Sequence, residues 1–193
     1  LAVATRLDAQ LARLDAASRN VSSAGSFAQM QEAHLRGMDG IVSRMGELAV
    51  LAQDGTMPDD IRALYDTEFQ QLKEMVNDVR TAQLNDVNLF DGQAREVTVS
   101  PEGDSVTMGD VDLFTDEFNV LTANTTRLTS MEGARAALDA TTAAGASVSI
   151  ERADIGSTLS RLEAASAQLT SQRESMTAAA SRIRDTDVAQ EST

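Results

Sequence analysis

The chain has 193 residues, of which 42% are hydrophobic, and its formal net charge at pH 7 is −14. This apolar content is enough for a folded core, whereas the acidic charge without a basic patch argues against binding to nucleic-acid phosphates. The absence of cysteine excludes disulfides and thiolate metal sites. No segment has the roughly 18 consecutive apolar residues of a membrane span, and no signal-peptide pattern is visible. Because the chain opens at Leu1 already in helical phase, we expect that sequence precedes it.

A first long helix is predicted over about residues 1–54. Apolar and small residues recur there at steps of four and three, which is the period of a coiled-coil seam. Gly55 then supplies a terminating glycine and Pro58 the start of the next helix. Gly25 and Gly37 are the positions at which the first helix could bend. The seam consists of Leu7, Leu11, Leu14, Ser18, Val21, Gly25, Ala28, Leu35, Met38, Val42, Met45, Leu48 and Ala52.

A second helix is predicted over about residues 58–82, and the short turn before it implies that it packs antiparallel to the first. Its apolar residues form one stripe, which we expect to face the core. The stripe consists of Ile61, Leu64, Tyr65, Phe69, Leu72, Met75, Val76 and Val79.

The middle of the chain, residues 93–129, changes character. Arg95–Ser100 and Ser105–Met108 alternate β-branched and polar residues around a turn at Pro101–Asp104, which predicts a β-hairpin. Residues 109–127 show less periodicity, so we expect an irregular segment with one more short strand.

A third helix is predicted over residues 130–193. Its seam contains Arg152 and Arg173 at positions where an apolar side chain is expected, so each guanidinium must pair with a carboxylate or reach solvent. The other seam residues are Val148, Ile155, Leu159, Leu162, Ser166, Leu169, Met176, Ala180 and Ile183. The predicted fold is mainly α: an elongated antiparallel bundle or coiled-coil rod of three helices, with the β-hairpin region inserted between the second and third.

Short motifs stand in a fixed order along these elements. They are Ala16–Asn20, Arg44–Val50 followed by Gly55 and Thr56, Leu89–Gly92, Arg152–Gly156, Arg161–Glu163 and Ser181–Asp187. Together they resemble bacterial flagellin, specifically its D1 domain, over nearly the whole chain.

The resemblance implies a domain plan. Residues 1–92 correspond to the N-terminal D1 helices, 93–129 to the β-hairpin region of D1, and 130–193 to the C-terminal D1 helix. The terminal D0 arms and the outer D2 and D3 domains of flagellins have no counterpart in this sequence. Two residues depart from the family pattern: Gly46 replaces a longer polar side chain, and Leu51 replaces a glutamine.

The sequence offers no enzyme site and no cofactor motif. The single histidine, His34, has no cysteine or catalytic motif around it, and we expect it at the rim of the first helix. Asp110, Asp112 and Asp116 lack the turn glycine and bidentate glutamate of a calcium loop, so we interpret them as solvated acids.

The resemblance also implies an interaction site at Arg44, Glu47, Leu48 and Glu68. In flagellins the matching positions lie on the surface that packs between subunits and that the flagellin-sensing Toll-like receptor contacts. From the residues alone, an exposed Leu48 among charges would suit a small binding hot spot, whereas a Leu48 inside the seam would leave an ordinary helix surface.

The function implied is that of a structural subunit of the flagellar filament, self-assembling for motility. The implied partners are other flagellin subunits, the flagellar export machinery and its chaperones, and the receptor; the implied location is outside the cell, in the flagellum. Two alternatives stay open: a surface-displayed flagellin-like protein that binds a ligand, and the hook–filament junction protein.

Overall fold

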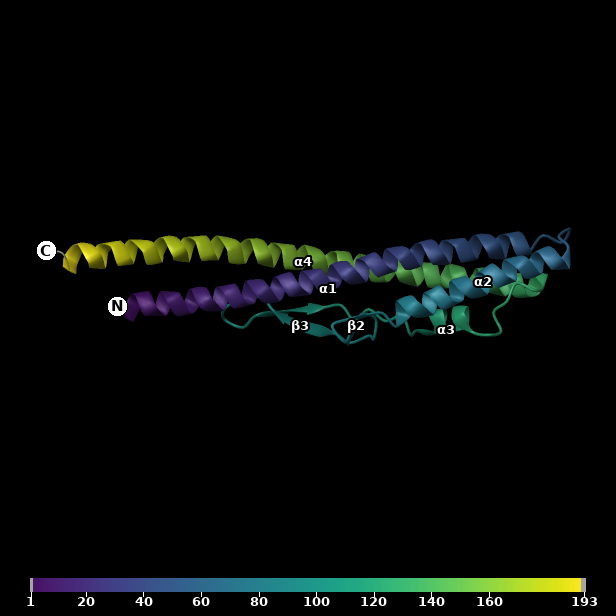
Figure 1. The fold of residues 1–193 in the computed structure, drawn as a ribbon, viewed down its shortest axis with the longest axis horizontal. Helices are drawn as coiled ribbons and strands as arrows, with labels where there is room; N and C mark the ends of the chain where they lie inside the picture. The colour runs from purple at the N-terminus through teal and green to yellow at the C-terminus, as the bar shows by residue number, and fades with distance from the viewer. Residues whose placement is uncertain (1, 192–193) are drawn as a thin grey trace. The chain divides into compact units, whose positions relative to one another are not determined.

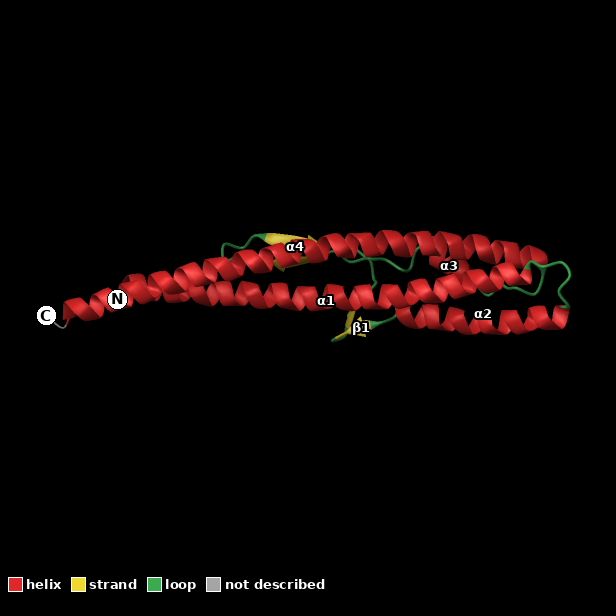
Figure 2. Ribbon diagram, turned by 90° about the horizontal axis from the view of Figure 1, so that it is seen from above, coloured by secondary structure: helices red, strands yellow, loops and turns green. Residues whose placement is uncertain are grey.

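The computed structural model describes the backbone of residues 2–191 and the side chains of residues 5–183. The chain divides into two compact units: Leu1–Ala28, Arg95–Met108 and Ser157–Thr193 make the first, and Gln29–Ala94 and Gly109–Gly156 make the second. Helices dominate both units, with small antiparallel β elements beside them (Figures 1 and 2). Among the described residues, no helix combines the length and apolar character needed to cross a bilayer.

The two long helices are α1, Ala2–Ala52, and α4, Met131–Glu191. In the second unit they pack antiparallel: a Cβ at Gly46 would lie 3.6 Å from Thr141 Oγ1, and one at Gly145 would lie 3.7 Å from Val42 Cγ1.

The predicted seam is confirmed along most of α1. In the first unit, however, Ala17 and Ala24 are buried instead of Ser18 and Gly25. Burial of the alanine methyl groups removes apolar surface from water, which is favourable, whereas an exposed Ser18 keeps its hydroxyl hydrated.

The two seam arginines each pair with carboxylates, which is one of the two outcomes expected for them. In the second unit, Arg152 Nη2 lies 3.0 Å from Glu32 Oε1 and Arg152 Nη1 lies 3.7 Å from Asp39 Oδ2. The hydrogen bond from Arg152 is the largest influence on Glu32 and lowers the pKa of its carboxyl. In the first unit, Arg173 Nε lies 3.0 Å from Asp15 Oδ1. The motif Ser181–Asp187 continues beyond Ile183, and the side chains of residues 184–187 lie outside the described residues.

Helix α2, Asp59–Arg80, begins directly after Pro58 and has two acidic residues in its first turn and Arg80 in its last, which complements the helix dipole. The buried side chain of Arg62 donates to the backbone carbonyls of Ala52 and Asp54, at 3.0 and 3.1 Å. These bonds fasten the α1–α2 turn, and α2 runs back beside α1 in the second unit (Figure 2).

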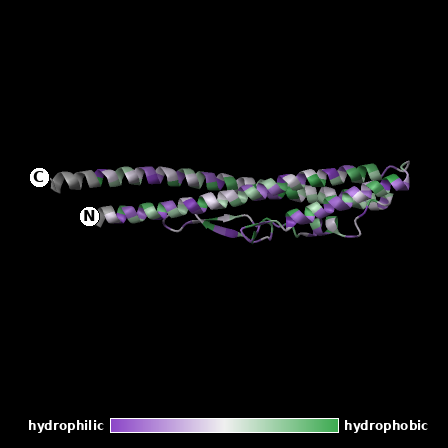
Figure 3. Ribbon diagram, in the orientation of Figure 1, coloured by the Kyte–Doolittle hydropathy of each residue, from purple (hydrophilic) through white to green (hydrophobic). Residues whose placement is uncertain are grey.

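The expectation that one apolar stripe of α2 faces the core holds only in part. The buried residues of α2 are Arg62, Asp66, Phe69, Lys73, Val76 and Arg80, whereas Ile61, Leu64 and Met75 are exposed. At 100° per residue, the buried face lies about a quarter turn away from the centre of the apolar stripe. The ribbon of α2 alternates between hydrophobic and hydrophilic residues along its length (Figure 3). The reason is that the charged side chains of α2 find backbone partners in the turn before it and in residues 113–128.

The predicted hairpin is confirmed as β3, Arg95–Thr98, paired antiparallel with β4, Ser105–Met108, in the register Arg95↔Met108 to Thr98↔Ser105. Its turn closes with a bond from Val99 N to Asp104 O, and Gly103 takes a φ of +104°.

A smaller hairpin joins α2 to this region and was not predicted. Strand β1, Gln83–Leu84, pairs with β2, Val87–Asn88. The two loop residues Asn85 and Asp86 have φ values of 51° and 62°, as a type I′ turn requires.

The segment predicted as irregular with one short strand instead contains a fourth helix. Helix α3, Asp116–Thr122, follows Thr115 and starts with Asp116 and Glu117, a sequence typical of a helix N-terminus. Phe118 and Leu121, three residues apart, are buried on one side of it. The only β pairing described for residues 109–127 is a single bridge, Asp91↔Asp112. The count of three helices is therefore not confirmed: the described residues form four.

Candidate interaction site

The structure brings three of the four expected site residues together on the surface of the second unit. Arg44 of α1 donates through Nε to Glu68 Oε1 of α2 at 2.7 Å, and through Nη1 to Glu47 Oε2 at 3.0 Å. The side chain of Arg44 is 45% exposed and that of Glu68 is 42% exposed. The pair bridges two antiparallel helices and remains open to solvent.

The electrostatics of this group follow from those bonds. The hydrogen bond from Arg44 lowers the pKa of the Glu68 carboxyl. The same bond, with that to Glu47, raises the pKa of the Arg44 guanidinium. Both shifts favour the charged forms of Arg44 and Glu68. Because they are exposed and screened by water, their effect on stability is small, and their main effect is to hold Arg44 in one orientation.

Leu48 does not join this surface. Its side chain is 0% exposed and belongs to the α1 seam. The hypothesis of an exposed Leu48 among charges is therefore wrong, and the apolar part of a contact surface has to come from other residues.

Three exposed apolar side chains supply it. Leu51 lies two helical turns after Arg44 on the same face of α1, and Ile61 and Leu64 lie seven and four residues before Glu68 on α2. Leu64 is 64% exposed, and Leu51 and Ile61 are also exposed. We call the six residues Arg44, Glu47, Leu51, Ile61, Leu64 and Glu68 the α1–α2 patch.

The apolar members of the α1–α2 patch were missed because apolar residues on a helix are assigned to the core by default. A usable signal was present in the sequence. The face of α2 next to the apolar stripe carries Asp66, Lys73 and Arg80 at seven-residue intervals. Such spacing places the three charged side chains in one line along the helix. If the helix is rotated so that these side chains face inward, part of the apolar stripe must face solvent.

The other residues considered from the sequence lie elsewhere. His34 is half-buried, with its ring edge-on to Phe90 at 6.1 Å between ring centroids. Within the part of the chain that the structure describes, no group of three histidine, aspartate or glutamate side chains is arranged to hold a metal ion.

Comparison with known proteins gives the family. The model of the bacterial flagellin N-terminal helical region matches residues 1–95, and that of the C-terminal helical region matches residues 138–193. Flagellin of Halalkalibacterium halodurans is 33% identical over 194 residues, covering 99% of this chain and 71% of the relative. The chain belongs to the bacterial flagellin family. It is accordingly a structural subunit of the flagellar filament, the motility fibre on the cell exterior.

Solved structures agree on the flagellin fold. The crystal structure of Bacillus cereus flagellin superposes with a TM-score of 0.69 at 28% identity, covering 84% of this chain and 94% of that one. A putative flagellar hook-associated protein from Vibrio parahaemolyticus gives a TM-score of 0.80 over 93% of this chain and 95% of that one, but at 15% identity. That second likeness concerns the fold alone, so the hook–filament junction alternative gains no support from it.

Proposed function

We propose that the α1–α2 patch is one of the surfaces through which flagellin subunits pack in the filament. The observation that carries this proposal is the exposure of Leu51, Ile61 and Leu64 next to the Arg44–Glu68 pair. Apolar side chains bordered by oriented charges are typical of protein interfaces, because burial of the apolar part supplies affinity and the charges fix register. Repetition of one such contact between different surfaces of successive subunits generates an open fibre.

The packing proposal gives a role to Leu51, one of the two residues that depart from the family pattern. The family pattern has a glutamine there, so the leucine adds apolar area to the α1–α2 patch. Since Leu51 is exposed, it gains little from the fold of the subunit itself. Its apolar surface is removed from water only when another chain covers it.

The same patch is also our candidate for contact with the flagellin-sensing Toll-like receptor. Arg44, Glu47 and Glu68 are presented on the surface, and the buried Leu48 packs beneath them instead of contacting a partner. Subunit packing and receptor contact would then exclude each other, so the receptor would bind free subunits.

We further propose that the chain is exported by the flagellar machinery with its chaperones. Passage through a secretion channel requires an unfolded chain, and a fold without disulfides presents no covalent barrier to it. We also propose that residues 1–193 correspond to the D1 region of flagellins.

The packing proposal is tested by Leu64→Asp in the full-length protein, added to short filament seeds. Burying a charge without a partner should raise the critical concentration for elongation about tenfold or more. Ala63→Asp is the matched control, because it adds the same charge at an exposed neighbouring position about 100° around the helix. Sedimentation of elongated filaments measures both. Equal elongation by the two variants would exclude the α1–α2 patch as a packing surface.

A further inference from the structure

Three of the four charged residues on the inward face of α2 stand seven residues apart: Asp66, Lys73 and Arg80. All three are buried, with between 4% and 6% of their surface exposed. Seven residues are about two helical turns, so the three side chains lie in one line along the helix. All three reach the same stretch of chain, residues 113–128, which contains α3 and which we call the strap.

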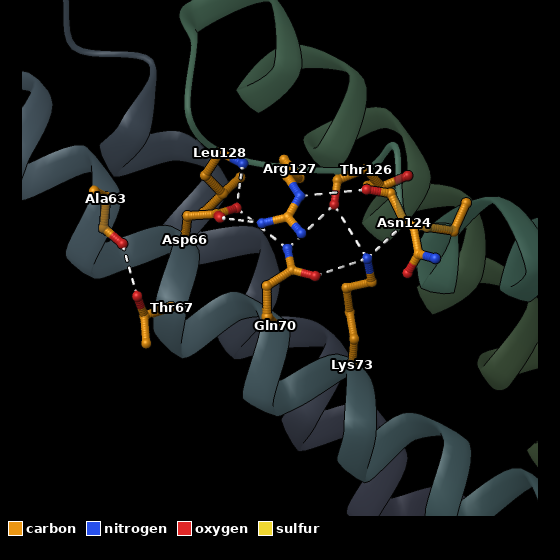
Figure 4. A network of polar contacts seen from close by, with 10 residues as sticks. Ala63, Asp66, Thr67, Gln70, Lys73, Asn124, Thr126, Arg127 and Leu128 are labelled. Atoms are coloured by element: carbon orange, nitrogen blue, oxygen red, sulfur yellow. Dashed lines mark hydrogen bonds and ion pairs between the residues drawn. The ribbon is translucent and has the colours of Figure 1, made fainter.

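The contacts are made mainly to the strap's backbone. Lys73 Nζ donates to the carbonyls of Ala123 and Thr126, at 2.5 and 3.2 Å. Asp66 accepts from the backbone N–H of Leu128 at 2.8 Å and from Arg127 at 3.1 Å. Figure 4 shows these side chains of α2 pointing toward the strap, with Gln70 between Asp66 and Lys73.

Arg80 holds the other end of the strap. Its Nε donates to the carbonyl of Leu113 at 2.7 Å, and its terminal nitrogens donate to Asn119 at 2.6 Å and Thr122 at 3.1 Å. Its guanidinium carbon also lies 4.7 Å from the centre of the Phe114 ring. The strap is therefore fastened to α2 near its start, middle and end.

These bonds hold the strap, but they remove the charged groups of Lys73 and Arg80 from water. Lys73 and Arg80 donate to neutral oxygens, and burial lowers the pKa of both side chains. The nearby carboxylate of Asp66 is shared with Arg127, whose charge also repels Lys73. A buried cation that donates only to neutral oxygens loses much of its hydration energy, and for Arg80 the charge of Asp112 opposes this loss. Undocking the strap therefore returns favourable solvation to both cations.

Apolar side chains oppose this opening. Leu113, Phe118, Leu121 and Leu128 of the strap are fully buried. Helix α3, however, has only seven residues, which is too short for it to stay helical once undocked. The strap must therefore dock and undock as one unit.

We propose that residues 113–128 form a charge-fastened strap that opens from α2 as a local cooperative unit while α1, α2 and α4 remain folded. This device is separate from the α1–α2 patch, which lies on the outward face of α2. The strap also lies outside both family-model regions, residues 1–95 and 138–193.

The absence of natural cysteines allows a direct test. One thiol is introduced at a time into the full chain: Leu121→Cys in the strap, and Ala144→Cys at a fully buried position of α4. Alkylation by iodoacetamide under native conditions then reports how often each site opens. We expect the strap thiol to react at least tenfold faster than the α4 thiol, after correction for intrinsic reactivity. Equal rates would overturn the proposal, because both sites would then open only by global unfolding.

The role of the charges is tested in the same two backgrounds. Asp66→Ala removes the acceptor of Leu128 N–H and Arg127, and should speed alkylation of the strap thiol roughly tenfold or more without affecting the α4 thiol. Glu74→Ala, at an exposed acid of the same helix, is the matched control and should change neither rate. An equal effect of the two substitutions on the strap thiol, or equal acceleration of both thiols by Asp66→Ala, would also overturn the proposal.

If Leu121→Cys does not fold, hydrogen exchange of the unmodified chain replaces it. Amides of residues 116–122 should then exchange at least tenfold faster, relative to their intrinsic rates, than those of residues 137–148 in α4. Equal protection of the two segments would count against the strap.

Discussion

At the scale of single residues, the start of α4 depends on a glycine. Ser130 Oγ accepts from the N–H of Gly133 at 3.0 Å, which caps the first turn of the helix. A Cβ at Gly133 would lie 2.6 Å from the carbonyl oxygen of Arg127. No L side chain fits there without moving the backbone of the strap's last residues.

We therefore expect Gly133→Ala to lower the free energy of unfolding by about 1–3 kcal/mol. Gly40→Ala is the control, because a Cβ at Gly40, in the middle of α1, meets nothing within 4 Å. That change should raise the free energy of unfolding by up to about 1 kcal/mol through helix propensity. Urea denaturation measures both, and a stabilising Gly133→Ala would contradict the described start of α4.

A second residue-scale effect concerns pH. Burial raises the pKa of the Glu151 carboxyl to about 7, and the neighbouring charges of Asp154, Asp110 and Asp112 add to the rise. Because the folded chain holds this proton more tightly than the unfolded chain does, the stabilisation is complete below the unfolded pKa, near 4.5. It is lost as the pH rises through about 7.

Glu151→Gln should remove this dependence. We expect the variant to have nearly the wild-type urea midpoint at pH 5 and a higher midpoint than wild type at pH 8. Glu132→Gln, an exposed position on the same helix, should leave the difference between the two pH values unchanged. A wild-type advantage over Glu151→Gln at pH 8 would show that the ionised Glu151 is not repelled.

At the scale of elements, α2 is placed by its charges as much as by its apolar residues. Asp66, Lys73 and Arg80 turn inward to the strap, and the apolar stripe is consequently divided between the core and the surface. Phe69 stays fully buried, whereas Leu64 is exposed. The stripe alone would assign both to the core.

This orientation predicts unequal responses to truncation. Phe69→Ala should lower the free energy of unfolding of the subunit by about 3–5 kcal/mol, because it leaves a cavity. Leu64→Ala should change it by no more than about 0.5 kcal/mol, because an exposed side chain loses little packing. Denaturation of the two variants decides the point: comparable losses would mean that α2 is not rotated as described.

The contrast between elements shows what a sequence pattern can predict. The courses of α1 and α4 and the β3–β4 hairpin follow from local periodicity or from turn residues. The rotation of α2 and the helix α3 do not, because Asp66 and Leu128, which bond to each other, are 62 positions apart. In the candidate site, resemblance identified Arg44, Glu47 and Glu68, whereas Leu51, Ile61 and Leu64 required the structure.

At the scale of the whole molecule, the two family models describe the helical regions at either side of a middle segment that neither of them covers. The family models cover α1, α2 and most of α4, whereas residues 96–137 contain β4, α3 and the strap. We interpret the matched helices as the part that carries filament packing. The middle supplies the strap and most of the β3–β4 hairpin.

The central claim is that this flagellin packs in the filament through the α1–α2 patch. The most direct measurement is electron cryomicroscopy with helical reconstruction of filaments grown from the full-length protein. We expect the side chains of Leu51, Ile61 and Leu64 to be covered by a neighbouring subunit, with Arg44 and Glu68 at the border of the contact. Filaments in which these three side chains remain in contact with solvent would contradict the claim.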